Sequence, residues 1–462
     1  MRPWSPTRLK EWFLRPRVGP WAGSKDRTVG GEDTQESLDV AGEAQALGIT
    51  SDDYHPVKGV GFVSARVMPH DIEEDTVLGF DSPAVRATNR LLREALLSRA
   101  SDIHLEDHLT GLRIRYRVDG ILSDQDAPPP ELRAAILARL RVMAGLNLAE
   151  HRLPQDGRMR VHFRGAAIDM RVSTVPMLNG ESVVVRLLDP ARSAIEIEDL
   201  GFSPRAFQTV LDVIAKPHGM ILATGPGGSG KSTTLHAIAR RLSTGREKIL
   251  TVEDPVEAEI ENLCQVQVNE RAGLTFPVIL RALVRQDPDV LLVGEIRDAE
   301  TADIATHVAL TGHLVLSTLH TIDAVSALSR LLHLGVPDYL ITHTIEAVIA
   351  QRLVRKVCEE CAQEVHYAEG ELGALGPAAQ KLTSGQKGAG CEACDHTGYR
   401  GRIGLYEVLC VTDPIREAFM RRVGIGELRT VAAESGMRAL REDGVGKIRA
   451  GLTTPDEVLR VT

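Results

Sequence analysis

The sequence predicts an α/β protein, and three observations support this fold class. An apolar strand runs into a glycine-rich loop and then a helix, alternating strands precede this unit, and two Cys-x-x-Cys pairs follow it. The chain has 462 residues, which is enough for about two to four domains. Its 43% hydrophobic content with only 4% aromatic residues fits cores built from Leu, Val, Ile and Ala.

The glycine-rich loop has the sequence GPGGSGKS and lies between a strand at 220–223 and a helix that continues through 233–239. This strand–loop–helix context indicates a P-loop, in which backbone N–H groups turn toward phosphate oxygens. Lys231 would supply a positive charge to the β- and γ-phosphates of ATP, and the Ser232 hydroxyl would ligate Mg²⁺. The residues predicted to bind nucleotide here are Gly225, Pro226, Gly227, Gly228, Ser229, Gly230, Lys231, Ser232 and Thr233.

Carboxylates follow two further apolar strands, which are predicted at 249–252 and 290–293. The ends of such strands are where α/β folds bind their ligands. Glu295 stands where an acid would reach the metal or the attacking water, so we expect it to be the main catalytic carboxylate. Glu257 is the second candidate, and Asp254 belongs to the same cluster, which would hold Mg²⁺ or orient water.

A fourth strand, predicted at 314–318, has a histidine on each side. Either His313 or His320 is a candidate sensor of the γ-phosphate. The alternative is that each histidine is structural.

Five segments, taken in order, resemble the secretion ATPases that power type II secretion, type IV pili and type IV secretion: GPGGSGKSTTLHA, TVEDPVE, VQVNERAGLTF, RALVRQDPDVLLVGEIRDAETA and LTGHLVLSTLHTIDA. The resemblance runs from about Ser82 to the C-terminus and implies a RecA-like ATPase core. One departure is Gly227, where relatives usually carry Thr. The resemblance also implies that Arg281 and Arg285 contact the nucleotide phosphates, and their i,i+4 spacing places both on one helix face. The alternative is a pair of surface charges.

Upstream of the P-loop, residues 112–118 alternate strictly between apolar residues and arginines. One face of this strand should therefore meet a core, while the other carries Arg113, Arg115 and Arg117. The surrounding segments resemble the family's second N-terminal domain, a small PAS-like α/β sheet that packs on a neighbouring subunit and can lend arginines in trans. These three arginines are thus candidates to complete the site, although a solvated sheet face is the alternative.

Two Cys-x-x-Cys pairs follow the core, and their spacing is typical of a tetrahedral zinc site with four thiolates. The predicted ligands are Cys358, Cys361, Cys391 and Cys394. Disulfides are the alternative, but the chain carries no secretory signal segment. Four sulfurs would close the coordination sphere, so a structural role is expected. Flanking residues resemble the tetracysteine module of type II secretion and pilus extension ATPases, a module that retraction ATPases typically lack. Cys264 and Cys410 are predicted to be core residues.

The first 75 residues are weakly patterned, and Trp4, Trp12 and Trp21 lie among basic residues there. They would form a docking arm, a disordered segment or the product of a wrongly assigned start. The predicted domains are a variable arm and linker (1–75), an Arg-rich PAS-like domain (76–190), a hinge (191–200), a RecA-like ATPase core (201–351), a tetracysteine zinc module (352–410) and a C-terminal helical subdomain (411–462).

These observations together predict a homohexameric ATPase that uses ATP, Mg²⁺ and Zn²⁺. Its expected partners are the cytoplasmic domains of inner-membrane secretion or pilus platform proteins, with acidic phospholipid as a further candidate. A net charge of −9 argues against a general nucleic-acid binder, and no apolar run approaches the ~20 residues of a membrane span. We therefore expect a cytoplasmic protein held peripherally at the inner membrane by its partners. The function expected is powering the type II secretion pseudopilus; a pilus extension ATPase and a nucleic-acid motor are the alternatives.

Overall fold

The computed structural model describes residues 70–72, 82–109, 111–188 and 195–462. The predicted N-terminal arm and linker (1–75), with its three tryptophans, lies outside the described residues except for 70–72, where His70–Asp71 pairs with the sheet of the domain predicted to begin at 76. The part from 70 to 188 and the part from 195 to 462 are described separately below.

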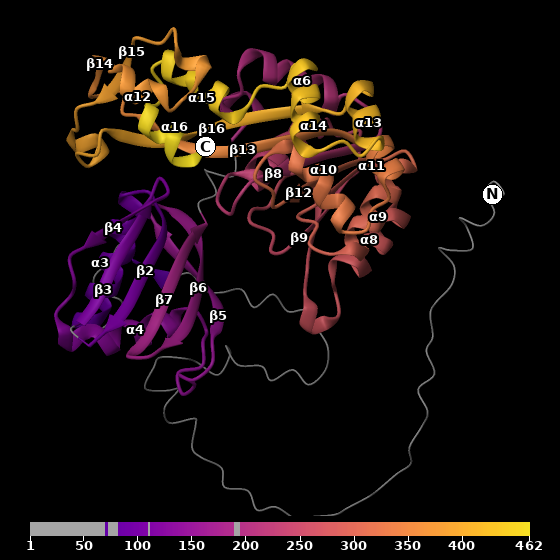
Figure 1. Ribbon diagram of the computed structural model, residues 1–462. Coiled ribbons are helices and arrows are strands. Elements are labelled where there is room, and N and C mark those ends of the chain that lie inside the picture. Colours follow the sequence, from indigo (N-terminus) through magenta and orange to yellow (C-terminus); the bar gives the residue numbers. More distant parts are fainter. Residues whose placement is uncertain (1–69, 73–81, 110, 189–194) are drawn as a thin grey trace, which may run out of the picture. The chain divides into compact units, whose positions relative to one another are not determined.

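The first part contains one mixed sheet and two helices (Figure 1). Its elements are β1 (His70–Asp71), α3 (Pro83–Leu97), β2 (Ala100–His108), β3 (Gly111–Val118), β4 (Ile121–Gln125), the 3-10 turn η2 (Pro130–Leu132), α4 (Arg133–Met143), β5 (Gln155–Phe163), β6 (Ala166–Met177) and β7 (Gly180–Leu188). The strand order is β1-β5-β6-β7-β2-β3-β4. All pairings are antiparallel except that of β1 with β5.

The two faces of this sheet differ because its strands alternate. On one face, Ile103, Ile114 and Val185 are almost completely buried in a single cluster with Leu92 of α3 and Ile136 of α4. The opposite face carries the arginines of β3, as the alternation predicted.

The second part is built on another seven-stranded sheet, with the order β10-β9-β11-β12-β8-β13-β16. Its strands are β8 (Gly219–Thr224), β9 (Ile249–Glu253), β10 (Leu263–Gln267), β11 (Val290–Val293), β12 (Leu314–Leu319), β13 (Ile345–Val357) and β16 (Tyr399–Cys410). They are parallel except for β16, which runs antiparallel to β13. The central parallel strands β8, β9, β11 and β12 are buried along their whole length and mostly apolar, because helices cover both faces of the sheet.

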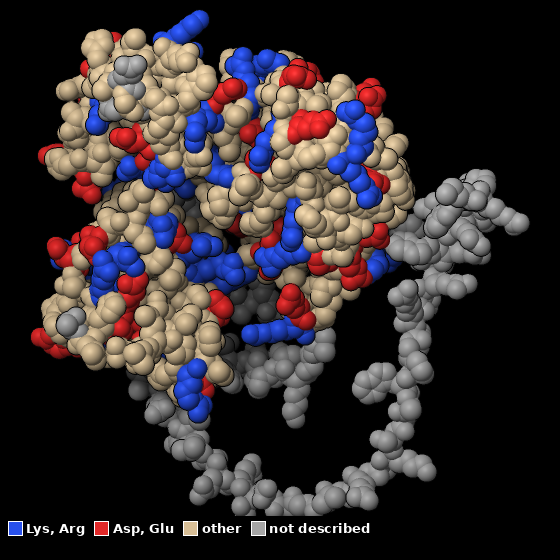
Figure 2. Space-filling model, in the orientation of Figure 1, with Lys and Arg blue, Asp and Glu red and all other residues tan. Residues whose placement is uncertain are grey.

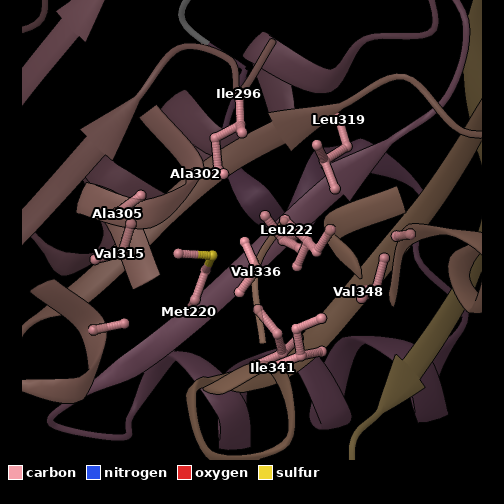
Figure 3. Packing of buried hydrophobic residues seen from close by; sticks show 14 of the residues in the cluster. Met220, Leu222, Ile296, Ala302, Ala305, Val315, Leu319, Val336, Ile341 and Val348 are labelled. Carbon is pink, nitrogen blue, oxygen red and sulfur yellow. The ribbon is translucent and has the colours of Figure 1, made fainter. Parts of the chain in front are cut away.

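The helices of this part are α6 (Pro204–Ile214), α7 (Lys231–Leu242), α8 (Phe276–Leu283), α9 (Ala299–Leu310), α10 (Ala324–His333) and α11 (Asp338–Thr344), with short turns η3 (Ile197–Leu200), η4 (Glu270–Ala272) and η5 (Val284–Gln286). Figure 3 shows how side chains of the central strands meet those of the helices that cover one face. Met220 and Leu222 of β8 are fully buried there, next to Ala305 of α9 and Ile341 of α11. The other face packs against α6 and α7.

After β13, the chain forms a small cysteine-rich module and then a helical tail. The elements are β14 (Ala362–His366), α12 (Glu369–Gly373), η6 (Pro377–Ala379), β15 (Ser384–Gly388), η7 (Glu392–Cys394), α13 (Asp413–Met420), α14 (Ile425–Glu434), α15 (Leu440–Arg449) and α16 (Pro455–Val461). Val354 of β13 and Leu405 of β16 share a core with Leu440, Ile448 and Val458 of the tail. The tail therefore packs on the same two strands that carry the module.

The predicted boundaries at 351/352 and 410/411 are wrong in one respect. β13 continues to Val357 and pairs with β16 from Ala347 to Val357, so the ATPase sheet and the cysteine module share both strands. The predicted hinge at 191–200 is also too long, because Ile197 is fully buried in the core cluster of α6 and α7. Cys264 is a further correction: it is exposed on the edge strand β10, where only one neighbouring strand covers it.

Candidate functional site

The P-loop joins β8 to α7 at the carboxyl edge of the parallel sheet. Three of its glycines have a positive φ that other residues adopt only with strain: +146° at Gly225, +71° at Gly228 and +89° at Gly230. Gly230 also lies close to β13, since a Cβ atom built on it would be 3.0 Å from Gln351 Nε2. The loop can thus bring its backbone N–H groups close to a ligand at the start of α7.

Lys231 is nearly buried and points back into the loop, where its Nζ donates to the carbonyl oxygens of Gly225 (2.9 Å) and Pro226 (3.0 Å). Burial lowers the pKa of the ammonium group, while the negative charge of Glu295 opposes this shift. The two side chains therefore act on each other electrostatically across the site.

Glu295 lies just beyond β11, one residue after Gly294. Two hydroxyls of β12 fix this strand end: Ser317 donates to the Val293 carbonyl and Thr318 to the Gly294 carbonyl, each at 2.8 Å. The carboxylate accepts a hydrogen bond from Arg297. It is mostly shielded from solvent but lines the same pocket as the P-loop lysine.

The acids that follow β9 line this pocket as well. Asp254 and Glu257 are exposed in the segment after the strand, and Asp254 lies 4.0 Å from Arg297. Ser232 contributes from the first turn of α7. The structure thus gathers Lys231 and Ser232 with the three carboxylates that the sequence singled out.

The two candidate histidines lie at opposite ends of β12. His320 follows the carboxyl end, and its Nε2 is 3.5 Å from Glu295 Oε2, on the rim of the pocket. His313 precedes the amino end, where its carbonyl accepts from Gly219 at the start of β8. A six-residue strand spans about 20 Å, so His313 lies far from the pocket of the P-loop, and its role as a γ-phosphate sensor stays a prediction that this geometry does not support.

The predicted phosphate-contacting arginines lie on an exposed surface. Arg281 pairs with Glu300 of α9, and Arg285 donates to the Arg281 carbonyl. Neither side chain lines the pocket formed by the P-loop and the carboxylates. Contact with a nucleotide would require these residues to act in another geometry or across an interface, and it stays a prediction.

On the sheet of the first part, the three candidate arginines have different surroundings. Arg113 pairs with Asp124 at 2.7 Å, and Arg115 pairs with Glu106. Arg117 donates to the Gly120 carbonyl and lies 3.9 Å from Asp102. The strand registers also place Arg117 in a row that continues across the polar face through Asp102, Arg186, Arg171 and Arg158.

The four cysteines of the module come together where β13 and β16 end. Their Sγ atoms all lie within 4.8 Å of one another, with separations of 3.9 Å for Cys358–Cys391 and Cys361–Cys394, and 3.7 Å for Cys391–Cys394. Tetrahedral Zn–S bonds of about 2.3 Å place sulfurs roughly 3.8 Å apart, whereas a disulfide needs about 2.05 Å. The arrangement fits a metal and excludes disulfides among these cysteines.

Backbone donors surround these sulfurs. The N–H of Gly390 points at Cys361 Sγ, and those of Cys391 and Gly398 point at Cys394 Sγ, at 3.2–3.3 Å. Burial raises the pKa of the Cys394 thiol, but hydrogen bonds, including these two donors, outweigh it and hold the pKa at about 6, whereas burial raises the pKa of the Cys361 and Cys391 thiols. Such N–H groups stabilise a thiolate, which is the form that binds metal.

Some residues that build the site escaped the sequence analysis. Gln351 of β13 is 1% exposed, and its Nε2 donates to the Ser229 carbonyl at 2.6 Å, so it supports the P-loop from behind. The neighbouring Arg352 donates to the Gln351 and Ile322 carbonyls and joins the P-loop to the segment after His320. The only signal in the sequence was their position in QRLVRKVCEEC, and it gave no reason to expect contact with the P-loop.

This α/β sheet, with a P-loop lysine and strand-end carboxylates at its carboxyl edge, defines a P-loop ATPase. The family described as "Type II/IV secretion system protein" matches residues 79–460, and the chain belongs to this family. The resemblance seen in the sequence is confirmed, and the protein is a secretion ATPase of this family.

Two relatives illustrate the range of the family. The type II secretion system protein E of Xanthomonas campestris pv. campestris is 46% identical over 399 residues, covering 85% of this chain and 70% of that protein. The type IV pilus assembly ATPase PilB of Thermus thermophilus is 46% identical over 384 residues, covering 83% of this chain and 43% of PilB. Type II secretion proteins and a pilus assembly ATPase are thus similar to this chain at the same level of identity.

Solved structures agree on the fold. The Legionella pneumophila ATPase DotB has a TM-score of 0.61 at 21% identity and covers 85% of this chain and 98% of its own. The pilus retraction motor PilT with bound ADP has a TM-score of 0.55 at 24% identity, covering 81% and 96%. At this identity the likeness shows the fold alone.

Two further features concern the predicted partners and location of the protein: the distribution of surface charge and the character of the helices. Acidic and basic side chains are interspersed over the face shown in Figure 2. Among the described residues, no helix combines the length and the apolar character that a membrane span requires.

Proposed function

We propose that the protein hydrolyses ATP to ADP and phosphate and thereby powers assembly of the type II secretion pseudopilus. The observation that carries this proposal is the convergence of Lys231 and Ser232 with Asp254, Glu257 and Glu295 around one pocket. Type II secretion system proteins of several bacteria are 45–48% identical to this chain, and the matched segment covers 70–78% of each of them but only 43% of PilB, which supports the choice of system.

The residues of the pocket divide the chemistry of phosphoryl transfer among them. When nucleotide binds, the Lys231 ammonium group exchanges its hydrogen bonds to the Gly225 and Pro226 carbonyls for contacts with the γ-phosphate, whose negative charge it balances. Glu295 orients the attacking water and takes its proton, while His320, beside that carboxylate, is placed to sense the γ-phosphate. Ser232 and Asp254 are the residues that would hold Mg²⁺, which when bound neutralises charge on the β- and γ-phosphate oxygens.

The tetracysteine cluster supports a structural zinc ion. Four sulfurs would fill a tetrahedral coordination sphere and leave no position for a substrate. The cluster joins β13, the strand whose Gln351 supports the P-loop, to its antiparallel partner β16. A metal there would fix the far end of this two-stranded ribbon.

A hexamer and its platform complete the proposal. Arginines on the polar face of the first sheet, Arg113, Arg115 and Arg117 among them, would reach the site of a neighbouring subunit in trans. The cytoplasmic domains of inner-membrane platform proteins would receive the motion, hold the ATPase peripherally at the membrane and convert the motion into addition of pilin-like subunits. Acidic phospholipid is a further candidate partner.

A second candidate function is pilus extension, and the identity to PilB favours it specifically. The same site and chemistry would then drive a different platform. The tetracysteine cluster fits either system.

Hydrolysis by the purified protein tests the proposal. We expect Mg²⁺-dependent ATP hydrolysis that falls about 10²- to 10⁴-fold in Glu295→Gln, which keeps the shape of the side chain but cannot accept a proton. Glu434→Gln, the same change at an exposed site on α14, is the matched control and should leave the rate unchanged. Equal rates in wild type and Glu295→Gln would refute the assignment of Glu295.

A further inference from the structure

A buried carboxylate at the end of β9 is fully engaged by hydrogen bonds. Glu253 is 4% exposed. Its Oε1 accepts from Thr251 Oγ1 at 2.6 Å and from Gln265 Nε2 at 3.1 Å, and its Oε2 lies 2.9 Å from His236 Nε2. Since a carboxylate can only accept, the His236 ring nitrogen must carry the proton in this contact. Glu253 is thus placed to hold other groups together rather than to activate water.

His236 attaches this carboxylate to the helix of the P-loop. It lies on α7, is 3% exposed and stands five positions after Lys231. α7 is packed on both β8 and β12, so its side chains move with the core of the sheet. The His236–Glu253 contact therefore links the end of β9 to α7, the helix that begins at the P-loop.

Gln265 extends the contact to the segment that follows β9. The amide group that donates to Glu253 also donates to the Ala258 carbonyl at 3.0 Å, and its Oε1 accepts from the backbone N–H of Ile260 at 2.7 Å. One amide side chain thus holds two backbone groups just after Glu257. The side chain of Glu257 is itself exposed, so its position depends on this backbone support.

We propose that His236, Glu253 and Gln265 form a positioning relay that fixes Glu257 relative to the P-loop; the inference rests on the proposed ATP hydrolysis, in which Glu257 is the second candidate for a catalytic carboxylate. The relay residues are positioning residues, because they act through backbone and side-chain contacts rather than on the nucleotide. An acid on an exposed segment is effective only if surrounding hydrogen bonds hold it in the reactive geometry. Loss of the relay should therefore slow the chemical step more than it weakens nucleotide binding.

Three variants test the relay in the full-length protein. His236→Leu removes the donor to Glu253, and Gln265→Leu releases Ala258 and Ile260 while leaving His236 and Glu253 in place. His236→Gln keeps an N–H donor at the position of Nε2. His333→Leu, the same chemical change at an exposed site of α10, is the control.

We expect kcat to fall about tenfold or more in both leucine variants, because small misplacements of a catalytic group have effects of this size. KM for ATP should stay within about twofold, and His236→Gln should recover most of the activity. Amide hydrogen exchange at Ile260 should accelerate in both leucine variants and stay slow in His236→Gln and His333→Leu. Gln265 is only half-buried and lies on an edge strand, so Gln265→Leu should fold. It therefore still tests the relay if His236→Leu does not fold.

Several outcomes would overturn the relay while leaving the proposed function intact. The relay is refuted if both leucine variants keep the wild-type kcat and the wild-type exchange rate at Ile260 while the wild type hydrolyses ATP normally. Equal loss in His236→Gln and His236→Leu is another such outcome, as is full activity of Glu257→Gln. By contrast, failure of the wild type to hydrolyse ATP would refute the proposed function, and with it the catalytic purpose of the relay.

Discussion

The cysteine cluster allows a prediction whose size follows from the structure. Replacing Cys391 by serine removes a sulfur that lies 3.9 Å from Cys358 Sγ and 3.7 Å from Cys394 Sγ, close to the roughly 3.8 Å edge of a zinc–sulfur tetrahedron. We expect the wild-type protein to contain one zinc ion per chain and the Cys391→Ser variant to contain almost none.

The consequence for stability should be large but local. A structural zinc site contributes about 10–16 kcal/mol of binding free energy in small zinc-dependent folds, which matches or exceeds the total stability of an ordinary domain, about 5–15 kcal/mol. The module from Cys358 to Cys394 should therefore lose its fold, whereas the ATPase sheet keeps its own buried core.

Metal analysis and hydrogen exchange measure both effects. Zinc content is determined by mass spectrometry after dialysis, and exchange is followed across residues 358–410. Cys264→Ser is the control, because this cysteine is exposed on β10 and stands apart from the four-sulfur cluster. One zinc per chain in purified Cys391→Ser would refute the four-thiolate site.

Three further predictions concern other parts of the molecule. Burial raises the pKa of Glu457, but ion pairs with Arg460 and Arg355 outweigh it and bring the pKa to about 2. The ionised group therefore adds about 3 kcal/mol to the free energy of unfolding above pH 4.5, and this contribution is lost as the pH falls toward 2. The melting temperature of Glu457→Gln should depend less on pH in this range than that of wild type, and identical profiles would contradict the assignment. Gln351→Leu leaves the Ser229 carbonyl without its donor, so nucleotide affinity should fall about tenfold in titrations with a fluorescent ATP analogue, and unchanged affinity would show that the P-loop holds itself. Mixing Lys231→Ala protein with Arg115→Ala protein should restore part of the hydrolysis if arginines act in trans, and no recovery at any mixing ratio would count against a shared site.

The sequence predicted the central strands and the P-loop well, because their signals are local. The strand predicted at 290–293 is β11 in the structure, and the segment predicted to be helical, 411–462, contains α13, α14, α15 and α16. Continuous apolar runs bounded by glycines and charged residues fix such elements without reference to the rest of the chain. The cysteine spacing predicted the metal cluster for the same reason.

Features that depend on tertiary contacts could not be predicted in this way. His313 and His320 are equivalent in sequence, since each flanks the same strand, and only the parallel pairing of β12 with β8 shows which one faces the P-loop. Gln351 and the His236–Glu253 pair depend on contacts between distant segments. The predicted boundary at 351/352 failed because β13 passes through it, from the P-loop to the cysteines, as one uninterrupted strand.

The most direct test of the central claim is a chromosomal Lys231→Ala replacement in the source cell, with exoprotein secretion and pilus-dependent surface movement measured in the same strain. We predict that secretion is lost while movement is normal. Normal secretion would contradict the claim; if movement were lost instead, the result would assign the ATPase to pilus extension.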